Sequence, residues 1–517
     1  MNFSNTDLGI FSIYLVALAG FGMYISLRGK QKDSKDYFLA SKSLPWWAVG
    51  GSLIASNISA EQFIGMSGSG YVVGMAIASY ELMAAITLII VAKFFLPIFI
   101  KREIYTMPQF LEQRYNKTVR TGLAFFWVLL FIFVNITSVL YLGGLALESI
   151  MGIPLMWGVV GLAIFSATFS IFGGLKAVVW TDVIQVIILI IGGLVASYMV
   201  LDAVGGGFVA GFKQLLIQAP EKFDMILDKS HDEYKNLPGL SVIIGGMWIA
   251  NLYYWGNNQY IIQRALAAKS LKQAQLGTAF AAFLKVLLPL IVVIPGIAAF
   301  VLEADITKPD QAYPWVLNNY VTTGFKGLAF AALIAAIGSS LSSMINSTST
   351  IFTLDIYKPL LARKGEVPES QLVKVGRISA AAALVVGVLV APALGDLDQA
   401  FQYIQEWTGF ISPGVVVVFV FGMFWKRATS LGATLVVIIS IPLSAAMKIF
   451  CTAMPFMDRM GYSFLILSAL LVVFSLTDKR GKQGEAVDKT LFKTSPMFNV
   501  SAILIIIMLV FIYYIWW

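Results

Sequence analysis

The sequence of 517 residues contains little charge and few residues that bind metals. Charged side chains make up 12% of the chain, and it has one histidine, His231, and one cysteine, Cys451. Globular domains carry roughly 25% charged residues, so this composition excludes an ordinary soluble protein. One histidine and one cysteine cannot supply the clustered ligands of a metalloenzyme site, and a single cysteine forms no intrachain disulfide.

The sequence also lacks a Gly-rich Walker loop, and no polar stretch is long enough to hold a nucleotide-binding domain. Asp488-Lys489-Thr490 resembles the start of a phosphorylated-aspartate motif, but Leu491 follows it in a short loop. These absences exclude an ATP-driven pump, and we expect no enzymatic activity. The net charge of +8 does not indicate nucleic-acid binding, because the basic residues lie between long apolar runs.

Those apolar runs dominate the chain. Apolar side chains make up 58% of it, the mean hydropathy is +0.82, and runs longer than about 18 residues can each cross a bilayer core of about 30 Å. The pattern predicts an all-α polytopic membrane protein with about fourteen transmembrane helices. We place them at 8–27, 45–71, 76–99, 119–149, 155–172, 177–203, 239–264, 272–301, 325–356, 371–393, 397–424, 429–450, 457–476 and 495–517.

Basic residues concentrate in alternate links between these helices. They follow the first, third, seventh and ninth spans and precede the last, whereas the other short links are nearly free of Lys and Arg. The basic link after the seventh span, for example, contains Arg264, Lys269 and Lys272. The positive-inside rule puts these links in the cytoplasm and both chain termini outside.

Two of the expected helices carry polar residues in the middle of the membrane. The second contains Ser56, Asn57, Ser59, Glu61 and Gln62 within residues 55–62. Polar and acidic side chains at this depth are costly unless they face a protein-lined cavity, so we expect the helix to be unwound here.

The seventh helix is interrupted in the same way, by Asn251, Tyr254, Gly256, Asn257 and Asn258 within residues 250–259. The two helices lie five spans apart and therefore run in opposite directions. Such a pair indicates a secondary transporter built from two inverted repeats. Hydrogen-bonded packing of two polar helices without a substrate is the open alternative.

This interpretation divides the chain into five parts. The inverted repeats are expected at 45–203 and 239–424, joined by an external loop at 204–238. Residues 1–44 form an extra N-terminal helix and cytoplasmic loop, and 425–517 form three extra C-terminal helices.

The same polar segments carry a family resemblance. The block Ser52-Leu-Ile-Ala-Ser-Asn-Ile-Ser-Ala-Glu-Gln-Phe-Ile-Gly-Met-Ser-Gly68 resembles bacterial sodium/galactose symporters of the sodium/solute symporter family. The likeness extends over nearly the whole chain, through Ala78–Glu81, Val179–Asp182, Asn251–Trp255, Ser339-Ser340 and Phe401–Glu406. It implies the five-plus-five inverted repeat of the leucine transporter, alternating access, and location in a bacterial inner membrane.

The resemblance also implies roles for individual residues. Sugar ligands match Gln62, Glu81, Asn251, Lys285 and Gln405; Tyr254, held by Asn57, matches an inner gate that stacks on the sugar; Met66, Tyr80 and Phe401 match an outer gate. The sodium site matches the carbonyls of Ala55, Ile58 and Ala336 and the hydroxyls of Ser339 and Ser340, and Asp182 matches an acid on the cation exit path. One sugar-binding serine of the family is replaced by Ala84.

The residue chemistry suits this assignment without proving it. A hexose needs groups that donate and accept hydrogen bonds and an aromatic face for its ring, and these amides, Glu81 and Tyr254 provide both. Hard cations such as sodium prefer oxygen ligands, which serine hydroxyls and free carbonyls supply. Glu81 and Lys285 could instead form a structural ion pair, the glutamines and serines could hold helices together, and the aromatic residues could be simple packing.

We therefore expect a symporter that couples inward sodium flow to uptake of a hexose such as galactose or glucose. Sodium would be the co-transported ion, and sugar, sodium and membrane lipid the partners; a homo-oligomer is left open. The alternatives are a sodium symporter for another polar solute such as an inositol, or a proton-coupled sugar carrier. A channel is distinguished by its inability to concentrate a solute.

Overall fold

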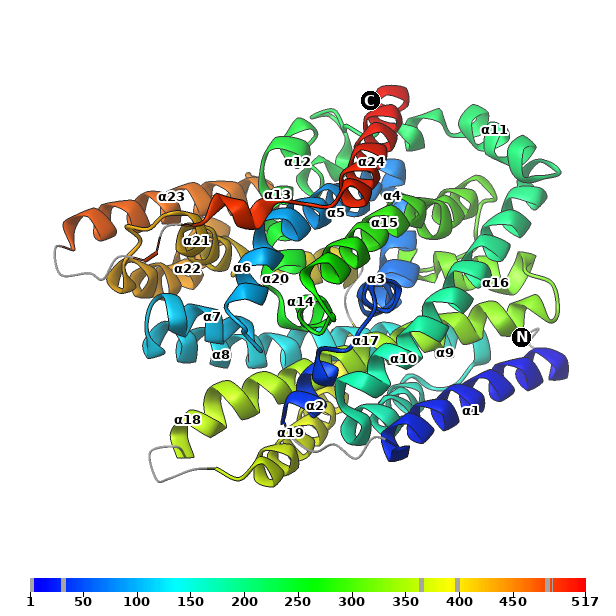
Figure 1. The fold of residues 1–517 in the computed structure, drawn as a ribbon. Coiled ribbons are helices and arrows are strands. Elements are labelled where there is room, and N and C mark those ends of the chain that lie inside the picture. The colour runs from blue at the N-terminus through cyan, green and yellow to red at the C-terminus, as the bar shows by residue number, and fades with distance from the viewer. Residues whose placement is uncertain (1–3, 29–33, 362–366, 396–399, 479–483, 486) are drawn as a thin grey trace.

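The computed structural model describes residues 4–28, 34–361, 367–395, 400–478, 484–485 and 487–517, and within these residues the protein is helical (Figure 1). The principal helices are α1 (Asn5–Arg28), α2 (Ser34–Leu39), α3 (Trp46–Asn57), α4 (Ser67–Val73), α5 (Ser79–Ile90), α6 (Leu96–Lys101), α7 (Met107–Arg114), α8 (Lys117–Leu130), α9 (Thr137–Met151), α10 (Leu155–Gly205), α11 (Phe208–Gln218), α12 (Leu240–Ile244), α13 (Gly246–Asn251), α14 (Gln259–Leu266), α15 (Leu271–Val301), α16 (Ala312–Tyr320), α17 (Phe325–Ile351), α18 (Lys358–Leu361), α19 (Glu369–Val390), α20 (Ala400–Gly409), α21 (Ser412–Phe424), α22 (Ser430–Phe450), α23 (Phe456–Thr477) and α24 (Pro496–Ile515).

Several helices join through π-helical turns. The turns used below are η2 (Glu61–Met66), η4 (Val91–Phe95), η5 (Phe131–Ile136), η8 (Leu252–Asn257) and η10 (Phe352–Tyr357). Such turns are rare and occur most often at functional sites. Here η2 and η8 lie in the two helices whose polar residues predicted an interruption.

Ten helices among the described residues are long and apolar enough to cross a membrane, or up to twelve if each of two bent pairs counts as one span. The multi-span prediction is thereby confirmed, whereas the number fourteen stays a prediction. The shortfall has a structural reason, because breaks shorten the segments concerned: α3 has 12 residues, and Leu155–Thr168 is another short apolar helix.

A glycine separates the fifth and sixth expected spans, which otherwise form the continuous helix α10. Gly174 has a φ of +57°, a conformation that glycine adopts at no steric cost. A Cβ atom at this position would also lie 2.5 Å from the backbone oxygen of Tyr37. The sequence prediction of a boundary between residues 172 and 177 therefore coincides with this kink.

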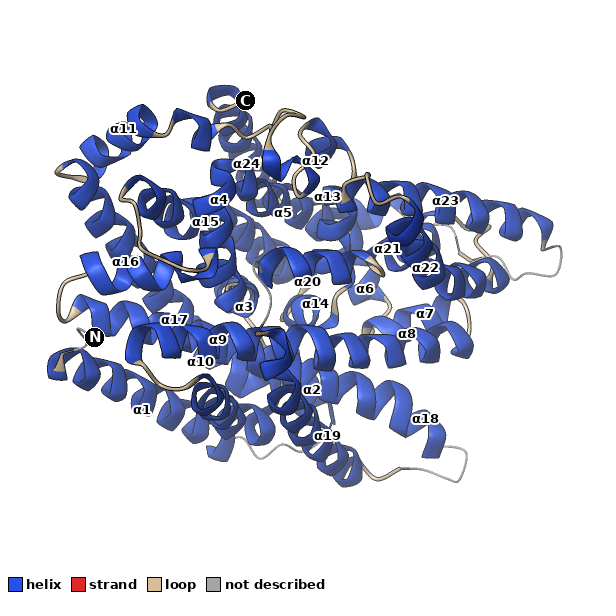
Figure 2. Cartoon of the chain, turned by 180° about the vertical axis from the view of Figure 1, so that it is seen from behind, coloured by secondary structure: helices blue, strands red, loops and turns tan. Residues whose placement is uncertain are grey.

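Burial distinguishes central helices from peripheral ones. The most apolar windows of the spans that contain α17 and α15 are 94% and 78% buried, against 17% for α1 and 22% each for α22 and α24. The thickest part of the molecule accordingly surrounds α3, α15 and α17, and α1 and α22 to α24 lie at the edges (Figures 1 and 2). Helix α24 buries one stripe, formed by Phe498, Ala502, Ile505 and Leu509, and its other faces are apolar and exposed, which suits contact with lipid.

Both predicted interruptions are present. The α3 helix ends at Asn57, Ile58 adopts extended angles (φ −73°, ψ 108°), and the helix resumes in η2. The seventh span bends by 81° at Gly245, and Asn258, with φ −82° and ψ 125°, separates η8 from α14. A third bend, of 47° between α20 and α21, was not predicted, although Pro413 stands at the start of α21.

Candidate functional site

The two interrupted helices meet at a small buried cavity of about 50 Å³. Its wall is formed by α3 and η2 of the second span, by α13 and η8 of the seventh, and by α5, α15, α20 and α21. Its lining is formed by Asn57, Glu61, Gln62, Tyr80, Glu81, Ala84, Ala250, Asn251, Tyr254, Trp255, Lys285, Phe401, Gln405, Thr408, Gly409 and Ser412. All six residues expected to hold sugar thus surround one cavity, although they come from five separate segments of the chain.

The break in the second span is stabilised by its own side chains. Gln62 Oε1 accepts hydrogen bonds from the Ser59 backbone N–H at 2.9 Å and from Ser59 Oγ at 3.3 Å. Ser59 Oγ in turn accepts from the Glu61 N–H at 3.0 Å. Short polar side chains commonly satisfy backbone groups at helix ends in this way. Gln62 therefore supports the break and lines the cavity, leaving its amide nitrogen as the group that can donate to a solute.

The cavity contains one ion pair. Lys285 Nζ donates to Glu81 Oε2, and both residues are buried. The Lys285 ammonium also lies 5.0 Å from the centre of the Trp255 ring. Buried charges of opposite sign compensate for some of the cost of desolvation. The pairing agrees with the structural alternative for these two residues, and their position in the cavity wall agrees with the functional one.

Aromatic residues close the cavity toward the α14 end. Asn57 Nδ2 donates to the Tyr254 hydroxyl at 3.0 Å, as expected for the inner gate. The Tyr260 hydroxyl donates to the same oxygen at 2.9 Å, a contact that the sequence did not indicate. Tyr254 is thus held by two partners, and its role as the inner gate stays a prediction.

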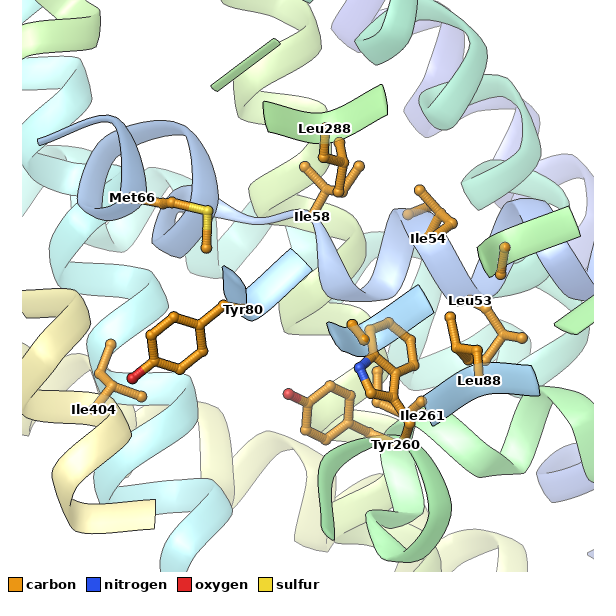
Figure 3. Close-up of a cluster of buried hydrophobic side chains, with 14 of the residues drawn as sticks. Leu53, Ile54, Ile58, Met66, Tyr80, Leu88, Tyr260, Ile261, Leu288 and Ile404 are labelled. Carbon is orange, nitrogen blue, oxygen red and sulfur yellow. The ribbon is translucent and has the colours of Figure 1, made fainter. Parts of the chain in front are cut away.

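Tyr80 and Phe401 also line the cavity, and their rings meet edge to face with centroids 5.1 Å apart. A Cβ atom on Gly65 would lie 2.9 Å from Phe401 Cβ, so α20 packs directly on η2. Figure 3 shows Tyr80 pointing toward Ile404, and Met66 beyond the extended stretch at Ile58. Met66 is fully buried but is not among the lining residues, so its gate role stays a prediction.

Ion pairs link helix α20 to the peripheral helices α22 and α23. Glu406, next to Gln405, pairs with Arg459 of α23 at 2.7 Å and with Lys448 of α22 at 3.3 Å. Ser444 Oγ also donates to the Phe410 carbonyl at the bend, at 3.0 Å. The peripheral helices thus fix the half-helix that carries Phe401 and Gln405.

A second polar cluster lies on the other side of the broken helix. Ser340 Oγ on α17 lies 3.0 Å from the Ser56 carbonyl oxygen and 3.5 Å from that of Ile58. These oxygens surround the point where α3 unwinds, so Ile58 and Ser340 lie together as the sodium-site prediction requires. Ala55 and Ala336 are buried nearby in the same two helices.

Ser339, the other serine of the predicted sodium site, is hydrogen-bonded to Asp182. Ser339 Oγ donates to Asp182 Oδ1 at 2.5 Å, and Ser52 Oγ donates to Asp182 Oδ2. Asp182 is completely buried, so its side chain lies inside the bundle, in contact with the expected cation ligands. Its role on the cation exit path stays a prediction.

Arg264 completes this cluster. It is fully buried on α14, and its guanidinium donates to Ser52 Oγ at 3.2 Å, to Ser343 Oγ and to the Tyr260 carbonyl. Its nearest nitrogen lies 3.9 Å from Asp182 Oδ2. Assigning Arg264 to a basic cytoplasmic link was therefore wrong. The available signal was its position after the apolar run Tyr260-Ile-Ile, where an ionisable residue indicates a functional or paired group.

A larger hollow of about 810 Å³ lies between α7, α8, η10 and α18. Its lining carries both signs of charge, and Arg120, Glu112 and Asp355 are already paired with one another. Neither interrupted helix contributes to it, so size alone does not make it the transport site.

The comparisons with known proteins identify the family of this chain. Residues 37–440 match the family model described as the sodium:solute symporter family. The chain is 53% identical to a sodium/glucose cotransporter of Vibrio parahaemolyticus over 99% of this chain and 98% of that protein. It is 34% identical to a mouse sodium/myo-inositol cotransporter 2, over 83% of this chain and 67% of that protein.

Solved structures show the fold. An outward-open, Na⁺-coupled sialic acid symporter superimposes with a TM-score of 0.83 at 24% identity, covering 93% of this chain and all of that one. A nucleobase-cation-symport-1 family transporter superimposes with a TM-score of 0.55 at 15% identity, covering 91% and 98% of the two chains. The predicted fold class, the inverted-repeat architecture of these symporters, is thereby confirmed.

Proposed function

This chain belongs to the sodium:solute symporter family, and from that premise we propose that it couples inward sodium flow to uptake of a hexose such as galactose or glucose. As a member of this family it is a secondary transporter and not an enzyme. The observation that carries the hexose assignment is the cavity at the meeting point of the two broken helices, with its amides, acids and aromatic ring.

The cavity matches the chemistry of a pyranose. Gln62, Asn251 and Gln405 offer amides that can both donate to and accept from ring hydroxyls. Tyr254 offers an aromatic face, and Glu81 a strong acceptor oriented by Lys285. Asn251 Nδ2 donates to the Met247 carbonyl at 3.1 Å, which leaves its amide oxygen as the group that can accept from a hydroxyl.

We place the transported sodium ion beside the unwound end of α3. Ligands would come from the carbonyls of Ala55, Ile58 and Ala336 and the hydroxyls of Ser339 and Ser340. The proximity of Ser340 to the Ser56 and Ile58 carbonyls supports this placement. The same segment continues into Gln62, so ion and sugar would stabilise one backbone arrangement. Asp182, which Ser339 contacts, would receive the ion on its way out.

Alternating access follows from the two gates. Tyr80 and Phe401 close one end of the cavity, Tyr254 the other, and transport requires them to open in turn. We further propose two inverted repeats, 45–203 and 239–424, and a bacterial inner membrane as the location, with both termini outside. The opposed broken helices support the inverted repeats, the alternating basic links support the orientation, and the 53% identity to a Vibrio parahaemolyticus protein supports the bacterial membrane. Lipid would contact α1, α22 and α24, and assembly into a homo-oligomer is left open.

A second substrate is favoured by one observation, the 34% identity to a sodium/myo-inositol cotransporter. Inositol, like a hexose, is a neutral ring of hydroxyls, and the same cavity chemistry suits it. A direct comparison of substrates separates the two.

The test is uptake of radiolabelled galactose, glucose and myo-inositol into proteoliposomes that contain the purified protein. An inward sodium gradient is compared with potassium and proton gradients of equal size. We expect saturable accumulation of a hexose above the outside concentration with sodium alone. Sodium-driven accumulation of inositol but not hexose would reassign the substrate, and accumulation driven by protons alone would overturn sodium coupling.

A further inference from the structure

Glu61 is a second buried carboxylate in the cavity, and the proposed sugar site gives it no role. It is the first residue after the break in the second span, and 5% of its surface is exposed. The bond from its backbone N–H to Ser59 fixes its position. Its Oε1 atom is buried without a hydrogen-bond partner in the structure, although buried polar atoms normally have one.

The charges around the cavity do not balance. Three ionisable acids and bases line it: Glu61, Glu81 and Lys285. The ammonium of Lys285 is bonded to Glu81, so Glu61 has no cation of its own in the wall. The nearby guanidinium of Arg264 is bonded to Ser52, Ser343 and the Tyr260 carbonyl and is not a lining residue. With its carboxyls ionised, the lining carries a net charge of −1.

We infer that Glu61 makes the cavity selective for uncharged hydroxylated solutes and excludes sugars that carry a carboxylate. The unpaired oxygen accepts a bond from a solute hydroxyl, which satisfies it. A carboxylate on the solute cannot donate and adds a second negative charge in a dry cavity of about 50 Å³. Like charges placed together in a desolvated site are strongly unfavourable. The inference rests on the proposed sugar site and adds the determinant of its charge selectivity.

The experiment compares a charged ligand, galacturonate, with a neutral one, 6-deoxygalactose, which has the same ring. Purified protein in saturating sodium at pH 8 and constant ionic strength binds radiolabelled galactose, which is displaced by unlabelled galactose, by galacturonate, or by 6-deoxygalactose. The last ligand lacks the hydroxyl that galacturonate replaces but is neutral, so it measures the effect of the missing hydroxyl alone. We expect wild-type protein to bind galacturonate at least about 100-fold more weakly than 6-deoxygalactose.

Two variants of Glu61 test whether it causes this gap, the difference in affinity between 6-deoxygalactose and galacturonate. Glu61→Gln keeps the shape and removes the charge, and should narrow the gap between galacturonate and 6-deoxygalactose by about tenfold or more. Glu61→Asp keeps the charge and should keep the gap. Glu303→Gln, the same change at an exposed residue outside the cavity, is the matched control and should bind all three ligands as the wild type does.

The outcomes separate this inference from the proposed function. If wild-type protein binds no neutral hexose in sodium, the sugar site itself is wrong. If it binds galactose but binds galacturonate as tightly as 6-deoxygalactose, or if Glu61→Gln leaves the gap unchanged, charge selection by Glu61 is overturned while the sugar site stands. Thermal unfolding of each variant shows that the binding changes are not caused by misfolding.

Discussion

Two buried polar clusters lie on either side of the broken second span, and they differ in how completely their polar atoms are paired. Around Asp182, both carboxylate oxygens accept serine hydroxyls, and the guanidinium of Arg264 has three hydrogen-bond partners. Around the cavity, Asn57 Oδ1, Glu61 Oε1 and the Tyr80 hydroxyl are buried without a partner.

From this difference we expect the paired groups around Asp182 to stabilise the fold and the unpaired groups of the cavity to bind a ligand. A buried polar atom without a partner costs about 1–3 kcal/mol, a cost that persists only where something offsets it. A solute with several hydroxyls supplies the missing partners in the cavity. Both carboxylate oxygens of Asp182 already have partners, so breaking this cluster should affect stability first.

Breaking the Asp182 cluster should give the largest effect. Arg264→Gln leaves a buried carboxylate without its cation, and removing one member of a buried ion pair costs about 3–5 kcal/mol. We expect a lower yield of monodisperse protein and a clear fall in the thermal unfolding temperature in detergent. Adding Asp182→Asn should recover part of the loss.

The control is Lys269→Gln, which changes an exposed base close to Arg264 in sequence. It should unfold as the wild type does. Wild-type unfolding of Arg264→Gln would mean that the cluster contributes little to stability, and the contrast between the two clusters would fail.

Substitutions in the cavity should weaken sugar binding more than they lower stability. Gln405→Ala removes a lining amide and should weaken sugar binding by about ten- to a hundredfold, because each lost hydrogen bond costs about 1–3 kcal/mol. Its unfolding temperature should stay near that of the wild type. Gln62→Ala should lose both affinity and some stability, because Gln62 Oε1 also holds the break. Equilibrium binding and unfolding of the two variants measure both effects, and normal uptake by both would remove these residues from the site.

Ser340→Ala tests whether the two clusters communicate through the broken helix. We expect a folded protein whose sugar binding no longer improves with sodium, a loss of about 1–3 kcal/mol of coupling. Sugar binding is measured in sodium and in choline, and reciprocity requires an equal loss in the effect of sugar on sodium binding. A variant that keeps the full sodium effect would place the ion elsewhere.

The sequence could predict the parts of this site that depend on polarity against an apolar background. The interruptions at residues 55–62 and 250–259 were visible because polar side chains are expensive at that depth. The bend between α20 and α21 was missed, although Gly409 and Pro413 flank it and such residues commonly mark the end of one helix and the start of the next.

Pairing between distant residues was beyond the sequence. Arg264 lies near a helix end, where the positive-inside rule counts it as a cytoplasmic charge, and its burial depends on Ser52 and Ser343 from other helices. Tyr260 follows Asn257, Asn258 and Gln259, and nothing in that run marks its hydroxyl as the partner of Tyr254. The exception is the ion pair of Glu81 with Lys285, which the sequence offered as one alternative for these two residues.

Ala84 offers the smallest change and tests whether the cavity wall has room for one more partner. It lines the cavity one helical turn from Glu81 and is 2% exposed, so a hydroxyl placed there would face the solute. Ala84→Ser should tighten hexose binding by about 0.5–1.5 kcal/mol, the usual net value of one added hydrogen bond. The wall contains an unpaired Glu61 oxygen and an unpaired Tyr80 hydroxyl, and a new serine that bonded to either would gain nothing for the sugar. Titration of galactose and of its monodeoxy analogues against wild type and variant distinguishes these cases. If the affinity gain of Ala84→Ser disappears for one deoxy analogue, the hydroxyl missing from that analogue is the one that bonds to the new serine. If galactose and every analogue bind the variant no more tightly than the wild type, the added hydroxyl bonds to the cavity wall instead.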